Sequence, residues 1–225
     1  MSEPDILKKV NILSNNNDET LYHFLSEQLN YESNNIEFWL SLAIAISYPP
    51  FGDEEKAIAF TRKALAIDSN NPIALIILAF MYEYHLGGID DTLLHKIKNL
   101  HSGSNEINSM LKYVASWSYA WHKKNDPEME EELLKESIEL CGKHVWNYVA
   151  LADLYSRQKR YLEINGLIKQ ALNNVKKIYT DKNLDEYTTT SINDFINSLI
   201  KGTHITDTNA QSIQERFICS NVNLI

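Results

Sequence analysis

Small residues recur along the chain at a nearly constant interval. Ala43, Ala79, Ala115 and Ala152 follow one another at spacings of 36, 36 and 37 residues. Large side chains stand one and four residues before each of them: Leu42, Leu78, Val114 and Leu151, and Trp39, Leu75, Leu111 and Tyr148. Positions three or four apart share one face of a helix, and a small residue there lets a second helix approach closely. The period therefore predicts stacked helix pairs, since one such unit cannot bury its apolar face alone.

Polar residues, Gly and Pro punctuate this period. Ser69-Asn70-Asn71-Pro72 and Asn125-Asp126-Pro127 are stop-start signals, because Asn tolerates left-handed φ and Pro suits a first helical turn. We expect repeats at about 36–70, 72–101, 108–141 and 145–175, after an atypical first pair at 1–30. Beyond residue 175 the period is lost, and we expect capping helices and an apolar tail over 176–225.

Two segments carry a family resemblance. Trp39-x2-Leu42-Ala43-x2-Ile46 and Tyr148-x2-Leu151-Ala152-x2-Tyr155 resemble the first-helix signature of the tetratricopeptide repeat (TPR). The resemblance covers about residues 18–175, although Ser118 replaces the aromatic residue of the third copy. It implies an all-α fold, a right-handed superhelical solenoid of antiparallel helix pairs with helical caps. It also implies a protein that acts by binding other proteins.

In this family the binding face is the inner, concave wall, formed mainly by the first helix of each pair. The resemblance places twelve residues there: Leu40, Ile44, Tyr48, Ile76, Phe80, Tyr84, Lys112, Ser116, Tyr119, Val149, Asp153 and Arg157. Members that grip a chaperone's terminal carboxylate carry Lys, Asn and Arg on this wall, whereas its first half here is apolar and aromatic. We therefore expect a protein partner, either an apolar segment or a basic surface, unless the chain's own tail or a second copy fills the groove.

Charge and composition restrict the partners further. The chain has 21 Lys and Arg against 30 Asp and Glu, a net charge of −9, which disfavours nucleic acid because phosphate contacts need clustered cations. The longest apolar stretch, 72–82, is too short to cross a bilayer, and residues 1–13 lack the apolar core of a secretion signal. The two cysteines form no disulfide framework. We expect a cytoplasmic protein with no membrane partner, and the sequence predicts no oligomeric state.

No catalytic motif is present in the sequence. Cys141-x2-His144 has a metal-like spacing but no second pair at zinc-finger distance, so we expect no metal and no cofactor. The glutamates of the segment 128–139 form either a solvated face or a docking surface for a basic partner: Glu128, Glu130, Glu131, Glu132, Glu136 and Glu139.

These observations predict a non-enzymatic protein-interaction module. The role that suits a small acidic repeat protein is that of a chaperone or immunity protein that masks a secreted effector or toxin. The alternative is a scaffold subunit of a larger assembly.

Overall fold

The computed structural model describes residues 1–15, 20–47, 53–85, 87–120 and 123–179, and within them all regular secondary structure is helical. It divides into two compact units, with unit 1 formed by Met1–Leu93 and unit 2 beginning at Leu94. The expected capping helices and apolar tail lie outside the described residues. None of the described helices combines the length and apolar character needed to span a bilayer.

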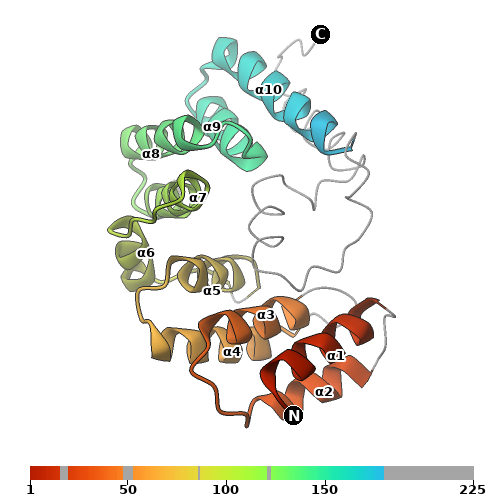
Figure 1. Ribbon diagram of the computed structural model, residues 1–225. Helices are drawn as coiled ribbons and strands as arrows, with labels where there is room; N and C mark the ends of the chain where they lie inside the picture. Colours follow the sequence, from red (N-terminus) through yellow and green to blue (C-terminus); the bar gives the residue numbers. More distant parts are fainter. Residues whose placement is uncertain (16–19, 48–52, 86, 121–122, 180–225) are drawn as a thin grey trace. The chain divides into compact units, whose positions relative to one another are not determined.

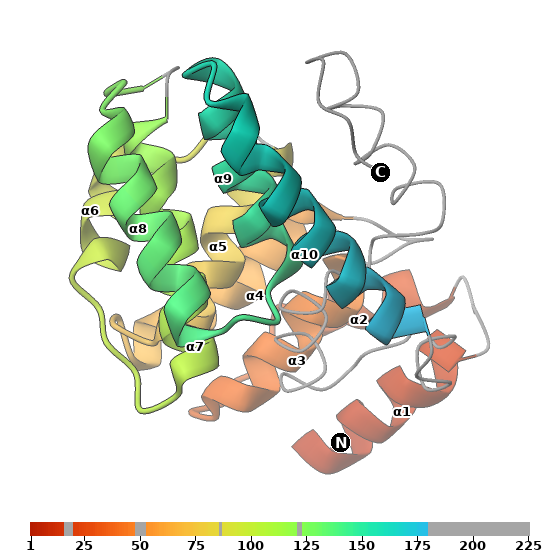
Figure 2. The same ribbon diagram turned by 90° about the horizontal axis from the view of Figure 1, so that it is seen from above.

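Unit 1 is built from consecutive helices that pack on their neighbours in sequence (Figures 1 and 2). They are α1 (Glu3–Asn15), α2 (Thr20–Gln28), α3 (Ile36–Ser47), α4 (Glu54–Ile67) and α5 (Pro72–His85). Helices α3 and α4 are antiparallel: Trp39 stacks on Phe60 with ring centroids 6.0 Å apart, and the Asp53 N–H donates to the Ile46 carbonyl at 3.0 Å. The repeat predicted at about 36–70 is therefore a helix pair, α3 and α4.

Unit 2 continues with α6 (Asp91–Lys98), whose first turn precedes Leu94, and then two further pairs. Its helices are α7 (Asn105–Ser116), followed by the 3₁₀ turn η1 (Trp117–Tyr119), then α8 (Pro127–Leu140), α9 (Val145–Arg157) and α10 (Tyr161–Tyr179). Figure 2 shows α7 beside α8 and α9 beside α10. The helices thus begin close to the positions that the sequence period predicts.

Side-chain caps fix where several helices begin. The carboxylates of Asp53 and Asp126 accept hydrogen bonds from the N–H groups of Lys56 and Met129, at 2.9 and 3.1 Å. Ser104 caps α7 in the same way. Such a cap contributes about 1 kcal/mol because it satisfies an N–H that has no partner within the helix. The punctuation seen in the sequence therefore has a direct structural cause.

The periodic alanines lie at the centres of the helix packing. Ala43, Ala79 and Ala152 are fully buried and Ala115 is 1% exposed. Each stands on the first helix of a pair, where a larger side chain would hold the neighbouring helix away. The interval read from the sequence is therefore a packing constraint.

The core of unit 2 contains a small polar cluster, Ser109, Ser137 and Asn147, in which each residue is fully buried and comes from a different helix. The two serine hydroxyls each donate to the other residue's carbonyl, at 2.8 and 2.6 Å. The Asn147 carboxamide donates to the hydroxyl oxygens of Ser137 and Ser109, at 2.5 and 3.2 Å. These bonds join α7, α8 and α9 at one level of the core.

Candidate functional site

Most of the apolar residues expected on a binding wall lie inside the protein. Leu40, Ile44, Ile76 and Val149 are between 0 and 4% exposed, as is Ser116 at 3%. The reason is clear in α3, where every residue over 38–46 is buried, and a helix that is apolar on all sides packs into a core. The structure therefore does not present these side chains on an accessible surface, and their role in binding stays a prediction.

The other predicted residues are partly accessible or fall outside the description. Phe80, Lys112, Tyr119 and Asp153 are partly exposed, and the Arg157 side chain is 27% exposed. Tyr48 and the Tyr84 side chain lie outside the described residues. Of the twelve, only Lys112 lines a groove that the structure describes.

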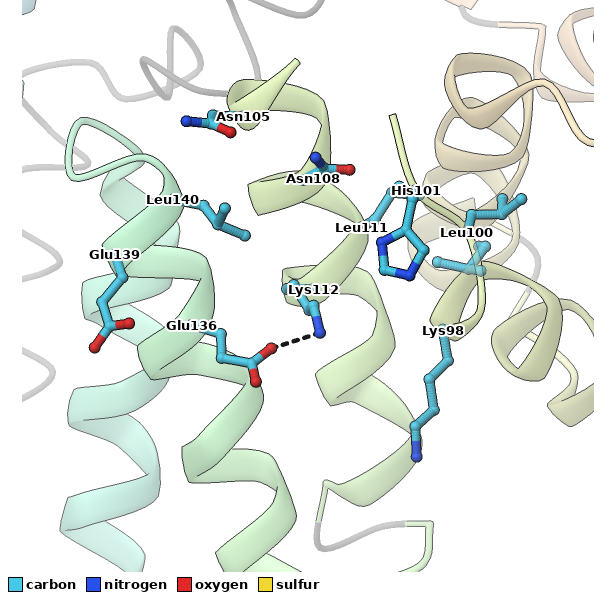
Figure 3. A pocket seen from close by; sticks show the side chains of 11 residues that line it. Lys98, Leu100, His101, Asn105, Asn108, Leu111, Lys112, Glu136, Glu139 and Leu140 are labelled. Atoms are coloured by element: carbon cyan, nitrogen blue, oxygen red, sulfur yellow. Dashed lines mark ion pairs between the residues drawn. The ribbon is translucent and has the colours of Figure 1, made fainter. Parts of the chain in front are cut away.

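This groove lies in unit 2, where the end of α6 and the connection after it meet α7 and α8 (Figure 3). It has a volume of about 410 Å³, within the usual range for binding sites. Its lining combines four apolar residues with seven polar or charged ones: Ile97, Leu100, Leu111 and Leu140, and Lys98, His101, Asn105, Asn108, Lys112, Glu136 and Glu139. We refer to it as the α7 groove.

An ion pair crosses the middle of the α7 groove. The Lys112 ammonium lies 2.5 Å from a carboxylate oxygen of Glu136, with the two side chains 28% and 40% exposed (Figure 3). At this exposure the pair adds at most about 1 kcal/mol of stability. Its main effect is to neutralise the cation on α7 with a carboxylate of α8.

Asn108 shapes one end of the α7 groove. Its carboxamide accepts from the Ser102 N–H at 2.7 Å and donates to the Ser102 carbonyl at 2.8 Å. Both bonds fix the connection between α6 and α7, which carries His101. His101 and Asn105 are both exposed side chains of the groove lining.

Lys98 is held at the margin of the α7 groove by Tyr119. Its ammonium donates to the Tyr119 hydroxyl and lies 4.9 Å from the centre of that ring. Lys124 stands 5.4 Å from the same ring. Tyr119, which was expected on the binding wall, thus interacts with two lysines of its own unit. Lys98 is turned away from the groove floor (Figure 3).

Two glutamates of the acidic helix α8 have structural partners. Glu130 accepts from Arg157 at 2.7 Å and Glu131 accepts from Arg160 at 2.6 Å. Burial alone would raise the pKa of Glu131, but hydrogen bonds from Arg160, Lys135 and Tyr155 outweigh it and lower that pKa to about 2. These two carboxylates therefore hold α8 against the end of α9 and cannot serve freely as a docking surface.

His144 is a buried imidazole at the start of α9. It is fully buried, packs edge-on against Tyr113 at 5.0 Å, and neither ring nitrogen has a partner in the described part of the chain. Burial lowers the pKa of His144 to about 3, so the ring is neutral near pH 7. Among the described residues no three potential ligands gather around it or elsewhere in a way that would hold a metal ion.

The sequence named Glu136 and Glu139 only as members of an acidic segment, and it missed the other residues that second helices contribute to the α7 groove. Glu136 and Glu139 belong to α8, and Ile97 and Lys98 belong to α6. The spacing of Glu128, Glu132, Glu136 and Glu139, which repeats at four, four and three residues, was the available signal for one acidic helical face.

The α7 groove can bind a chain segment through an apolar floor and a polar rim. Its exposed groups are the Glu139 carboxylate, the His101 imidazole and the Asn105 carboxamide, all of which can form hydrogen bonds or ion pairs with a peptide. No protein-family model matches the chain, and no curated protein sequence does either.

Proposed function

We propose that this chain is a TPR-like helical repeat protein that binds a segment of another protein and catalyses no reaction. Three observations support the repeat architecture: the period of about 36 residues, the antiparallel helix pairs, and the burial of the alanines that recur with this period. A repeat of this kind stacks into a right-handed superhelical solenoid.

The observation that carries the proposal is the α7 groove. It is open to solvent, and Leu100 and Leu140 are only half-buried there. Accessible apolar side chains with a rim of hydrogen-bonding groups are typical of sites that hold a peptide. The groove also includes Lys112, which the resemblance to the TPR family assigns to the binding face.

The test compares proteins captured from cells by the full chain and by two variants. Leu100→Asp with Leu140→Asp changes the half-buried floor of the groove, whereas Leu162→Asp changes a side chain that is 93% exposed on α10. We expect the groove variant to lose a partner that the Leu162→Asp control retains, with both variants keeping the helical circular dichroism of the parent. Retention of every partner by the groove variant would show that the groove is not the binding site.

The stoichiometry of the captured complex separates the two biological roles. A chaperone or immunity protein forms a 1:1 complex with one masked partner, whereas a scaffold appears among several subunits.

A further inference from the structure

The floor of the α7 groove fits apolar side chains of a partner. Ile97 and Leu111 are buried beneath it at 0 and 2% exposure, and Leu100 and Leu140 remain half-buried at its sides. Covering the accessible parts of these two leucines removes apolar surface from water, which favours binding. The occupant therefore carries at least one large apolar side chain.

The α8 side of the groove carries an acidic stripe. We define the acidic stripe as Glu128, Glu132, Glu136 and Glu139, which fall on one face of α8 because they are four, four and three residues apart. Glu128, Glu132 and Glu139 are exposed and have no ion-pair partner among the described residues. The stripe runs along α8 to the groove, where Glu136 and Glu139 form the lining.

The cations near the groove do not cancel this charge. Lys112 is paired with Glu136, and Lys135, beside the stripe, is paired with Glu131 at 2.7 Å. Lys98 keeps its positive charge, because its partner is the Tyr119 hydroxyl and not a carboxylate, but this bond turns it away from the groove floor. Across the groove from α8, His101 offers a hydrogen-bonding group to a peptide backbone, and Asn105 offers another at the start of α7. The three unpaired carboxylates of the acidic stripe outnumber the cations that remain, Lys98 and the exposed Lys143, so the unpaired charge around the groove is negative on balance.

We propose that the α7 groove binds a basic, amphipathic protein segment, with an apolar side chain over Leu100 and Leu140 and with Lys or Arg side chains along the acidic stripe. This inference rests on the proposed function and adds the chemistry of the partner. Complementary charge speeds and orients the encounter, and the apolar contact holds the bound segment.

The test measures the fluorescence anisotropy of three labelled twelve-residue peptides with the full chain. One alternates Leu with Lys, one alternates Leu with Glu, and one alternates Ser with Lys. We expect the Leu/Lys peptide to bind most tightly. Because the chain has a net charge of −9, the variants must separate the groove from general attraction.

The decisive variant is Glu132→Gln with Glu139→Gln, which removes two unpaired carboxylates of the acidic stripe. The matched control is Glu27→Gln with Glu32→Gln, which removes two exposed carboxylates of unit 1. We expect the stripe variant to bind the Leu/Lys peptide roughly threefold to tenfold more weakly than the parent, since each exposed ion pair contributes little by itself. The control should stay within about twofold.

Three results overturn the inference: equal weakening in both variants, tighter binding of the Leu/Glu peptide, or equal binding of the Ser/Lys peptide. None of these affects the capture experiment with Leu100→Asp and Leu140→Asp. If that groove variant loses its cellular partner while the Leu/Lys peptide fails to bind, the function stands and only the partner chemistry is wrong.

Discussion

Burial of His144 makes a specific prediction about acid stability. The ordinary imidazole pKa of 6.5 applies in the unfolded chain, whereas in the folded chain burial lowers it to about 3. Below pH 6.5 the unfolded state takes up a proton that the folded state refuses, so stability falls as the pH falls. The full contribution is present above pH 6.5, and it is lost progressively towards pH 3.

The magnitude follows from the size of this difference. Each pKa unit corresponds to about 1.36 kcal/mol, so lowering the pH from 7 to 5 removes about 2 kcal/mol of unfolding free energy through His144 alone. That is a large part of the 5–15 kcal/mol typical of a domain. Glu131 contributes little to the change between pH 7 and 5. Its pKa is 4.5 in the unfolded chain and about 2 in the folded chain, so the stability that it provides is lost mainly below pH 4.5.

The assay is urea unfolding followed by far-ultraviolet circular dichroism at pH 7, 6 and 5. His144→Phe keeps a ring against Tyr113 and has no titrating nitrogen, so this variant should lose about 2 kcal/mol less than the parent over that range. His95→Gln, at an exposed position on α6, is the matched control and should behave as the parent. An equal loss in parent and His144→Phe would refute the reasoning.

Two substitutions test the packing of unit 2. Ala115→Leu should lower the unfolding free energy by about 1–3 kcal/mol, because Ala115 is 1% exposed and the larger side chain displaces the neighbouring helix. The control Ala150→Leu, at a half-buried position of α9, should cost less. Comparable urea midpoints for the two variants would contradict this prediction. Asn147→Ala should cost about 1–3 kcal/mol, because it removes both hydrogen bonds to the hydroxyls of Ser109 and Ser137 inside the core. A loss below about 0.5 kcal/mol in urea unfolding would show that the cluster contributes little.

The sequence predicts the helices well because their signals are local. Alanines at a fixed interval determine where helices pack. Capping residues determine where helices begin, as Asp53 does for α4 and as Asp126, followed by Pro127, does for α8. These signals act within a few residues, so they can be read without knowing the partners of each helix. The all-helical character of the described residues is confirmed.

The candidate site was less predictable because its residues come together only in the tertiary structure. Lys112 meets Glu136 from the next helix, and the repeat pattern does not indicate which second-helix residues turn towards a first helix. In α3 the family resemblance assigned Leu40 and Ile44 to an accessible wall, but nearly every residue of this helix is buried, so its sequence distinguishes no face. For His144 the sequence showed only a metal-like spacing from Cys141, and nothing local indicated that its ring is fully buried.

The polar cluster of Ser109, Ser137 and Asn147 has a consequence for the alignment of three helices. Apolar contacts are non-directional, so they oppose a slide of one helix along another by a whole turn, about 5.4 Å, less specifically than hydrogen bonds do. A slide of α8 by that distance would break the two hydrogen bonds between Ser109 and Ser137 together with the hydrogen bond from the Asn147 side chain to Ser137. The polar atoms involved would then be buried without hydrogen-bond partners. The cluster therefore selects a single register for α7, α8 and α9, and with it the position of the acidic stripe beside the groove.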